Sequence, residues 1–101
     1  MTEALRDDDG KAPIDLIPPE VILALAEVYR FGAKKYAPRN WEKGMAWSRV
    51  YNSAMRHMLA FWGGEDMDAE SGLPHVYHAL WNCAALAWYK EHHPDKDDRP
   101  A

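Results

Sequence analysis

The chain has 101 residues, which is enough for one domain and only a small hydrophobic core. Its formal net charge of −4 at pH 7 excludes a protein that binds nucleic acid through bulk positive charge. No apolar run approaches the roughly 20 residues of a membrane helix, and the first residues lack a signal-peptide pattern. We therefore expect a cytoplasmic protein with no membrane partner.

Cys83 is the only cysteine, so no intrachain disulfide is possible and a reducing cytoplasm fits. It lies in the apolar run 79–88, which favours a small buried side chain. Acidic runs at 7–9 and 95–98 predict irregular, solvated tails at about 1–12 and 94–101. Residues 1–101 should thus form a single helical domain with two acidic tails.

A first helix is predicted at about 19–36, because Pro18-Pro19-Glu20 suits a helix start and Pro38 stops the helix. Its apolar residues follow one helical face. They are Ile22, Leu25, Ala26, Tyr29, Ala33 and Tyr36.

A second helix is predicted at about 47–62, capped by Ser48 and ended by the glycine pair 63–64. Two neighbouring faces of this helix carry mostly apolar residues. The first is Val50, Ala54, His57 and Phe61, and the second is Tyr51, Met55, Met58 and Trp62.

A third helix is predicted at about 74–92, between Pro74 and Pro94. It is apolar nearly all round, as is typical of a helix buried on most sides. One face carries His75, His78, Asn82, Leu86 and Tyr89, a second Trp81, Ala85 and Trp88, and a third Val76, Leu80, Cys83 and Ala87. The other helices of such a small chain would leave part of its apolar surface uncovered. We therefore predict an all-α fold, a small bundle of three main helices completed by homo-oligomerisation, with this helix near the interface.

Histidines and acids gather between residues 56 and 78. The group holds His57, His75, His78, Glu65, Asp66, Asp68 and Glu70, with Glu65 and Asp68 at ExxD spacing and His75 and His78 at HxxH spacing. Each residue taken alone also suits a core or surface polar position. Together they can hold a divalent metal, and because Mn²⁺ accepts imidazole as well as oxygen, Mg²⁺ or Mn²⁺ is expected. The lack of cysteines in the set argues against a structural zinc site.

The segment 30–56 is basic. Arg30, Lys34, Lys35, Arg39, Lys43, Arg49 and Arg56 face one acid, Glu42. Several Lys and Arg donors suit a polyphosphate, although Arg30 and Lys34 equally suit a solvated helix face. Trp41, with Asn40 beside it, either stacks on a purine or packs its loop onto the bundle. The phosphate loop GxxxxGK[ST], the GxSxG elbow and the HExxH motif are all missing from the sequence.

Several blocks of the sequence resemble one bacteriophage family. The blocks are Asp15-Leu16-Ile17-Pro18-Pro19-Glu20, Phe31-Gly32-Ala33-Lys34-Lys35-Tyr36, Arg39-Asn40-Trp41, Arg56-His57, Gly64-Glu65-Asp66-Met67-Asp68 and 71–78 (SGLPHVYH). The family is that of the dATP/dGTP diphosphohydrolases, related to the MazG-like all-α nucleotide pyrophosphohydrolases. The resemblance covers about residues 11–92. None of the blocks is specific alone, but the set is specific together.

The resemblance implies a helical, oligomeric enzyme that uses Mg²⁺ or Mn²⁺. Such an enzyme cleaves a purine deoxynucleoside triphosphate between the α and β phosphates and releases pyrophosphate. MazG-like proteins carry ExxE on one helix and ExxD on the next. Here Glu65 and Asp68 match ExxD, whereas Glu20 and Glu27 are seven residues apart and do not form ExxE. The histidines are candidates to replace it.

The expected roles follow from this resemblance together with the residue types. His57, Glu65, Asp68 and His78 would bind the metal, and Asp66 or His75 would act as base. The catalytic set is thus Glu65, Asp66, Asp68 and His75. Lys34, Lys35, Arg39 and Arg56 would neutralise the phosphates, and Asn40 and Trp41 would read the base. Two alternatives stay open: a nucleotide-sequestering protein of the same fold without turnover, which the missing ExxE motivates, and a helical interaction module.

Overall fold

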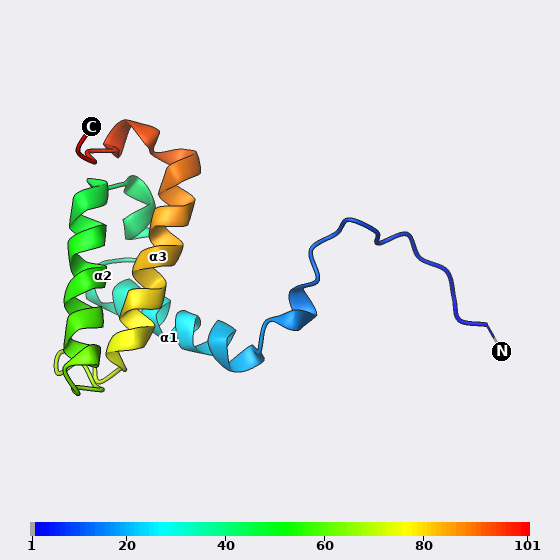
Figure 1. Cartoon of the computed structure of the whole chain (residues 1–101), viewed down its shortest axis with the longest axis horizontal. Helices are drawn as coiled ribbons and strands as arrows, with labels where there is room; N and C mark the ends of the chain where they lie inside the picture. Colours follow the sequence, from blue (N-terminus) through cyan, green and yellow to red (C-terminus); the bar gives the residue numbers. More distant parts are fainter. Residues whose placement is uncertain (1) are drawn as a thin grey trace.

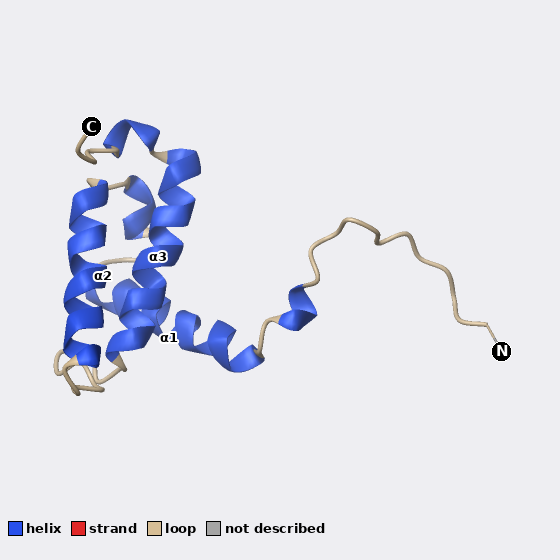
Figure 2. Cartoon of the chain, viewed as in Figure 1, coloured by secondary structure: helices blue, strands red, loops and turns tan. Residues whose placement is uncertain are grey.

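The computed structural model describes residues 2–101 and is helical throughout its ordered elements (Figures 1 and 2). The helices are α1 (Pro19–Lys35), α2 (Trp47–Trp62) and α3 (His75–His92). Three 3₁₀ turns accompany them: η1 (Ile14–Leu16), η2 (Asn40–Lys43) and η3 (Pro94–Lys96). Within residues 2–101 there is no strand. The predicted all-α bundle of three main helices is confirmed, with helix bounds within one residue of those expected.

Helices α2 and α3 run antiparallel and are joined by the turn 63–74; we call this unit the α2–α3 hairpin (Figure 1). Its core joins Trp47 and Val50 of α2 to Ala85 and Tyr89 of α3, and Tyr89 is fully buried. The Tyr89 hydroxyl donates to the Trp41 carbonyl, which ties the loop after α1 to the hairpin.

The apolar face identified in the sequence of α1 is only partly covered in the structure. The residues of α1 that are buried are Ala24 and Val28, whereas Ile22 is 47% exposed and Tyr36, just beyond the helix, is 66% exposed. Only part of α1 packs on the hairpin, against α3, and its first turns project away from the body (Figure 1). The described residues therefore leave the apolar side chains of those turns partly exposed, and helical periodicity alone does not show which residues of α1 are buried.

The predicted Ser48 cap is wrong. The residue before α2 is Ala46, and Ser48 lies inside the first turn. Its N–H and hydroxyl both donate to the carboxylate of Asp98, with 2.9 Å from N to Oδ1, so the chain's own C-terminal residues satisfy a free N–H of this helix. The indole N–H of Trp47 donates to the His93 carbonyl at 3.1 Å. Residues 94–101 are exposed, as expected of a tail, but they are tied to α2.

The expectation of a buried Cys83 is wrong, because its side chain is exposed. Helix α2 covers one side of α3, and α1 with its following loop covers a second. The third side, which carries Cys83, faces outward.

Residues 2–18 lead away from the body and give the molecule a longest dimension of 55 Å (Figure 1). Ile14, Leu16 and Ile17 in this segment are 66%, 74% and 45% exposed. None of the helices formed by the described residues is long and apolar enough to cross a membrane.

Candidate metal and nucleotide site

The turn 63–74 brings the end of α2 to the start of α3. Gly63 ends α2, and Gly64 has a φ of 98°, a conformation that glycine adopts without steric cost. Two backbone hydrogen bonds of 2.8 Å then fold the turn back on itself, from Asp68 N to Leu73 O and from His75 N to Asp66 O. This local structure holds Asp68 beside the first turn of α3.

Three histidine rings meet at this place. His57 Nδ1 lies 2.9 Å from His75 Nδ1, and the His57 ring stacks on that of His78 with 4.6 Å between centroids. His75 and His78 are buried, while His57 is half-buried. The predicted gathering of the three histidines is therefore present in the structure.

Carboxylates approach these rings from the turn. Glu65 Oε2 lies 2.7 Å from His75 Nε2, and Asp68 Oδ2 lies 3.8 Å from His78 Nε2. His78 Nε2 is also 2.6 Å from the hydroxyl of Ser71, whose N–H donates to Asp68 at 2.8 Å. Sequence reasoning missed Ser71. The available signal was its place three residues after Asp68, where a carboxylate commonly accepts a backbone N–H.

One subset has the spacing of a metal site. Ligand atoms of His57, Asp68 and His75 all lie within 4.8 Å of one another. Two ligands at about 2.1 Å from an octahedral ion and at right angles to each other are about 3.0 Å apart. The 2.9 Å between the two Nδ1 atoms matches that spacing. Two imidazoles and a carboxylate suit a divalent ion that accepts both nitrogen and oxygen, such as Mn²⁺.

The predicted metal set is therefore only partly brought together. His57 and Asp68 belong to the compact group, but His75, rather than His78, completes it. Glu65 contacts the far nitrogen of His75, the position from which a carboxylate orients a ligating imidazole. Asp66 is exposed and contributes its backbone carbonyl to His75 N.

The environment favours neutral imidazoles and an ionised Asp68. Burial lowers the pKa of His57, and the neighbouring His78 lowers it further. Burial also lowers the pKa of His78. Burial alone would raise the pKa of Asp68, but hydrogen bonds from Ser71 and the nearby His78 and His57 together lower it. Neutral imidazole and ionised carboxylate are the forms that bind metal.

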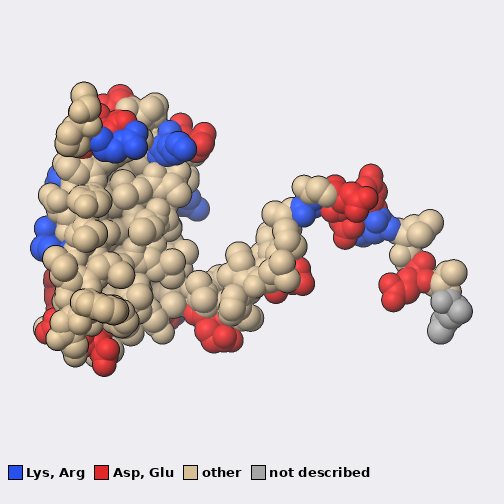
Figure 3. Space-filling model, viewed as in Figure 1, with Lys and Arg blue, Asp and Glu red and all other residues tan. Residues whose placement is uncertain are grey.

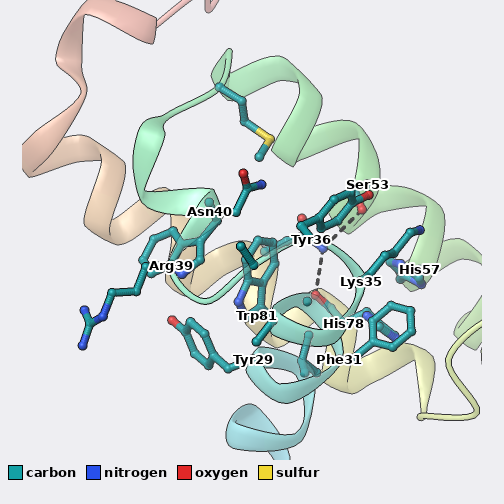
Figure 4. Close-up of a pocket in the computed structure, with 17 residues that line it drawn as sticks. Tyr29, Phe31, Lys35, Tyr36, Arg39, Asn40, Ser53, His57, His78 and Trp81 are labelled. Carbon is teal, nitrogen blue, oxygen red and sulfur yellow. Dashed lines mark hydrogen bonds between the residues drawn. The ribbon is translucent and has the colours of Figure 1, made fainter.

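A cavity of about 240 Å³ opens beside the histidines, between α1, the loop after it and the hairpin (Figure 4). Its walls include aromatic side chains, Phe31, Tyr36 and Trp81 among them. His57 and His78 lie at one end and Asn40 at the other (Figure 4). On its hairpin wall, Asn82 donates to Ser53 Oγ at 3.3 Å and to the His78 carbonyl at 2.8 Å.

The predicted substrate-binding residues divide into two groups. Lys35, Arg39, Asn40 and Trp41 line this cavity, whereas Lys34 and Arg56 are exposed and are not among its lining residues. Lys35 pairs with Glu70 across the gap between α1 and the turn, and Arg39 pairs with Glu42 at 2.9 Å.

Trp41 packs its loop onto the bundle. Its ring lies 4.9 Å from that of Trp88 and 6.0 Å from that of Trp81, measured between centroids. One of the two readings of Trp41 is thus confirmed, and its place in the cavity lining leaves the second as a prediction.

Fold and site together define a small all-α domain with a histidine–carboxylate cluster next to an aromatic cavity. Residues 1–99 match the family described as "dATP/dGTP diphosphohydrolase, N-terminal", and the chain belongs to this family. It is 35% identical over 95 residues to a protein named dATP/dGTP diphosphohydrolase from Salmonella phage PMBT28. That alignment covers 94% of this chain and 32% of the relative, so the chain spans about a third of the relative's length. No solved structure matches the chain.

Proposed function

We propose that this domain binds a purine deoxynucleoside triphosphate beside a divalent ion, Mn²⁺ or Mg²⁺, and hydrolyses it. Water would attack phosphorus and the P–O bond that bridges the α and β phosphates would break, giving the nucleoside monophosphate and pyrophosphate. The observation that carries the proposal is the compact group of His57, Asp68 and His75 at the end of an aromatic cavity. The name of the Salmonella phage relative supports the choice of substrate.

Each group near the cluster has a proposed part. His57, Asp68 and His75 would hold the ion, and Glu65 would orient His75 through its Nε2–H. A bound ion supplies charge stabilisation for phosphoryl oxygens and a more acidic water. Both nitrogens of His75 are engaged, by His57 and Glu65, so the exposed Asp66 is the better candidate base of the two predicted.

The cavity would take the purine, with Asn40 and Trp41 beside it. The phosphates would then extend toward the cluster, where Lys35 must exchange Glu70 for a phosphate oxygen. Arg39, Lys34 and Arg56 are exposed cations that would add attraction for the triphosphate.

One observation favours a second function, nucleotide binding without turnover. The chain spans about a third of the relative's length, and the remainder of that protein could hold its hydrolytic activity. In that case this domain would bind the nucleotide tightly without Mn²⁺ or Mg²⁺.

A nucleotide panel tests the proposal. The protein is incubated with the four dNTPs and four NTPs in Mn²⁺, Mg²⁺ or EDTA, and the products are separated by ion exchange. Metal-dependent monophosphate and pyrophosphate are expected from dATP and dGTP. Intact nucleotides, together with a melting shift that needs no metal, would favour binding alone.

Variants then assign the residues. Asp68→Asn removes a proposed ligand and should lower turnover by more than about 100-fold, while Glu65→Gln removes an orienting contact and should lower it by about 10–100-fold. Asp95→Asn, an exposed carboxylate in η3, is the matched control and should keep wild-type turnover. Full activity in Asp68→Asn, with unchanged helical content, would remove the cluster from the mechanism.

A further inference from the structure

Asn82 is a buried polar residue that has no part in the hydrolysis proposed above. The buried polar side chains of residues 2–101 are His75 and His78, which belong to the histidine cluster, and Asn82, which is 4% exposed. In the view of Figure 3, the charged side chains lie instead around the edges and ends of the body and along the projecting segment. Burying an amide is costly unless its nitrogen and its oxygen both find partners.

The amide nitrogen of Asn82 has its partners within the hairpin. It donates to the His78 carbonyl at 2.8 Å and to Ser53 Oγ at 3.3 Å, so both of its N–H groups are used (Figure 4). Because a carbonyl oxygen can only accept, the contact with His78 fixes which end of the amide is the nitrogen. The orientation of the amide oxygen, Oδ1, is thereby fixed as well.

The oxygen Oδ1 has no such partner. Within residues 2–101, the hydrogen bonds of the Asn82 side chain are the two that its nitrogen donates. Among the same residues, no side-chain nitrogen or oxygen is both enclosed and without a partner. Oδ1 must therefore keep accessible surface, and the open space that Asn82 lines is the cavity beside the histidines. A fixed and nearly buried acceptor is thus presented to whatever fills this cavity.

The place of Asn82 along the hairpin limits which part of a nucleotide it can meet. Asn82 lies four residues after His78 on α3, and Ser53 lies four residues before His57 on α2, each step being about 6 Å along its helix. Because the helices are antiparallel, both steps lead away from the turn 63–74. The acceptor is therefore about one helical turn from the imidazoles of the cluster.

This spacing matches the sugar of a nucleotide whose α phosphate lies at the cluster. The 3′ oxygen is about five bonds from the α phosphorus, which is roughly 5–6 Å at ordinary bond lengths. The far edge of a purine is about twice as many bonds away. A sugar hydroxyl can therefore reach Oδ1 from that position, whereas the amino group of the base lies too far along the cavity.

We propose that Asn82 accepts a hydrogen bond from the 3′-hydroxyl of the deoxynucleotide through Oδ1, and thereby selects nucleotides that carry this hydroxyl. The assignment rests on the proposed function, because it takes the α phosphate to lie at the cluster. A nucleotide without the hydroxyl would leave a nearly buried acceptor unpaired. That loss costs more than the loss of an exposed hydrogen bond, so Asn82 would act as a specificity-determining residue.

Hydrolysis of dGTP and of 2′,3′-dideoxyGTP by the whole chain in Mn²⁺ tests the proposal, because the two nucleotides differ only in the 3′-hydroxyl. In the wild type, kcat/KM should be at least about tenfold higher for dGTP. Asn82→Ala should bring this ratio close to one. Damage to the fold would lower both rates together and leave the ratio unchanged, so the ratio separates a sugar contact from a structural role.

Two further variants complete the experiment. Asn82→Ser keeps a hydroxyl that can bond the carbonyl four residues back, which protects the helix, but its side chain is too short to present an acceptor to the cavity. It should lose the preference for dGTP as Asn82→Ala does. Asn40→Ala is the matched control, since it removes an amide at the other end of the cavity. It should change both rates by the same factor and keep the ratio.

The outcomes separate this proposal from the proposed hydrolysis. Equal kcat/KM for the two nucleotides in the wild type, or a ratio that survives both Asn82 variants, would overturn the sugar contact and leave the hydrolysis in place. If neither nucleotide is hydrolysed, the hydrolysis fails, and dissociation constants from calorimetry replace the rates. Binding of dGTP that is about tenfold tighter than that of the dideoxynucleotide, and that loses this preference in Asn82→Ser, would support the contact. Equal or absent binding would overturn it.

Discussion

His75 contacts two different groups through its two ring nitrogens. An ionised carboxylate only accepts hydrogen bonds, so the contact with Glu65 places a proton on His75 Nε2. In neutral His75 the Nδ1 atom is then an acceptor, and the 2.9 Å contact requires His57 to donate from its own Nδ1. To bind a metal through Nδ1, His57 would move this proton to Nε2, whereas His75 is already in the binding tautomer.

The acid sensitivity of the fold should report the buried imidazoles. His57 and His78 have pKa values below the ordinary 6.5, so the folded state takes up fewer protons than the unfolded chain as pH falls. Their contribution to stability is fully present above about pH 6.5 and declines as the pH drops below that value. We expect the melting temperature in EDTA to fall between pH 7 and pH 5. His57→Gln should make this dependence shallower, and an unchanged slope in that variant would contradict the assignment.

At the scale of elements, the loop after α1 depends on a close approach to the end of α3. Gly44 has a φ of 95°, and a Cβ built there would lie 2.9 Å from Nδ1 of His93. The His93 ring cannot easily move away, because its Nε2 bonds the Glu42 carbonyl at 2.7 Å. Gly44→Ala should therefore destabilise the fold by about 1–3 kcal/mol.

Gly32→Ala is the matched comparison for this prediction. Gly32 lies within α1, and a Cβ there would meet nothing within 4 Å. Alanine should stabilise the helix by up to about 1 kcal/mol. Denaturant unfolding of both variants measures the two effects, and equal changes in the free energy of unfolding would show that the Gly44 conformation does not matter.

Local chemistry determines where each helix begins and ends, but it does not determine which segments pack against that helix. Prolines and glycines mark the helix ends only in part, but most of the bounds were predictable from residues at or beside them: Pro19, Gly63, Pro74 and Pro94. The buried face of α1, the cap of α2 and the exposure of Cys83 depend on which segments meet in space. The buried residues of α1 could not be predicted because its first turns leave the body, and the predicted cap of α2 was wrong because Asp98 arrives from the far end of the chain.

The site, too, could be predicted from the sequence only in part. The cluster of histidines and acids was predictable, because a short turn joins the two helices that carry the histidines. Which role each of these residues plays was not predictable. Whether Glu65 binds a metal or orients His75 depends on a 2.7 Å contact, and Ser71 enters through the shape of the turn. Spacing along a sequence does not contain these distances.

Over the whole molecule, stability should be uneven. Ala85 and Tyr89 of α3 are completely buried, whereas Val21, Ile22 and Leu23 of α1 are 42–65% exposed. We expect amide hydrogen exchange to be slowest in the middle of α3 and fastest, among the helices, in the first turns of α1. Uniform protection along the three helices would contradict this picture.

The pairing of Ser48 with Asp98 has a consequence for how a ligand enters. It fastens the hairpin at the end opposite the turn 63–74, so α2 and α3 are joined at both of their ends. Helix α1 lies outside this closed loop and is tied to the turn by the ion pair of Lys35 with Glu70. The hairpin wall of the cavity is therefore fastened at both ends, whereas an exposed ion pair joins the α1 wall to the turn. A ligand that displaces Glu70 from Lys35 would remove this link between α1 and the turn.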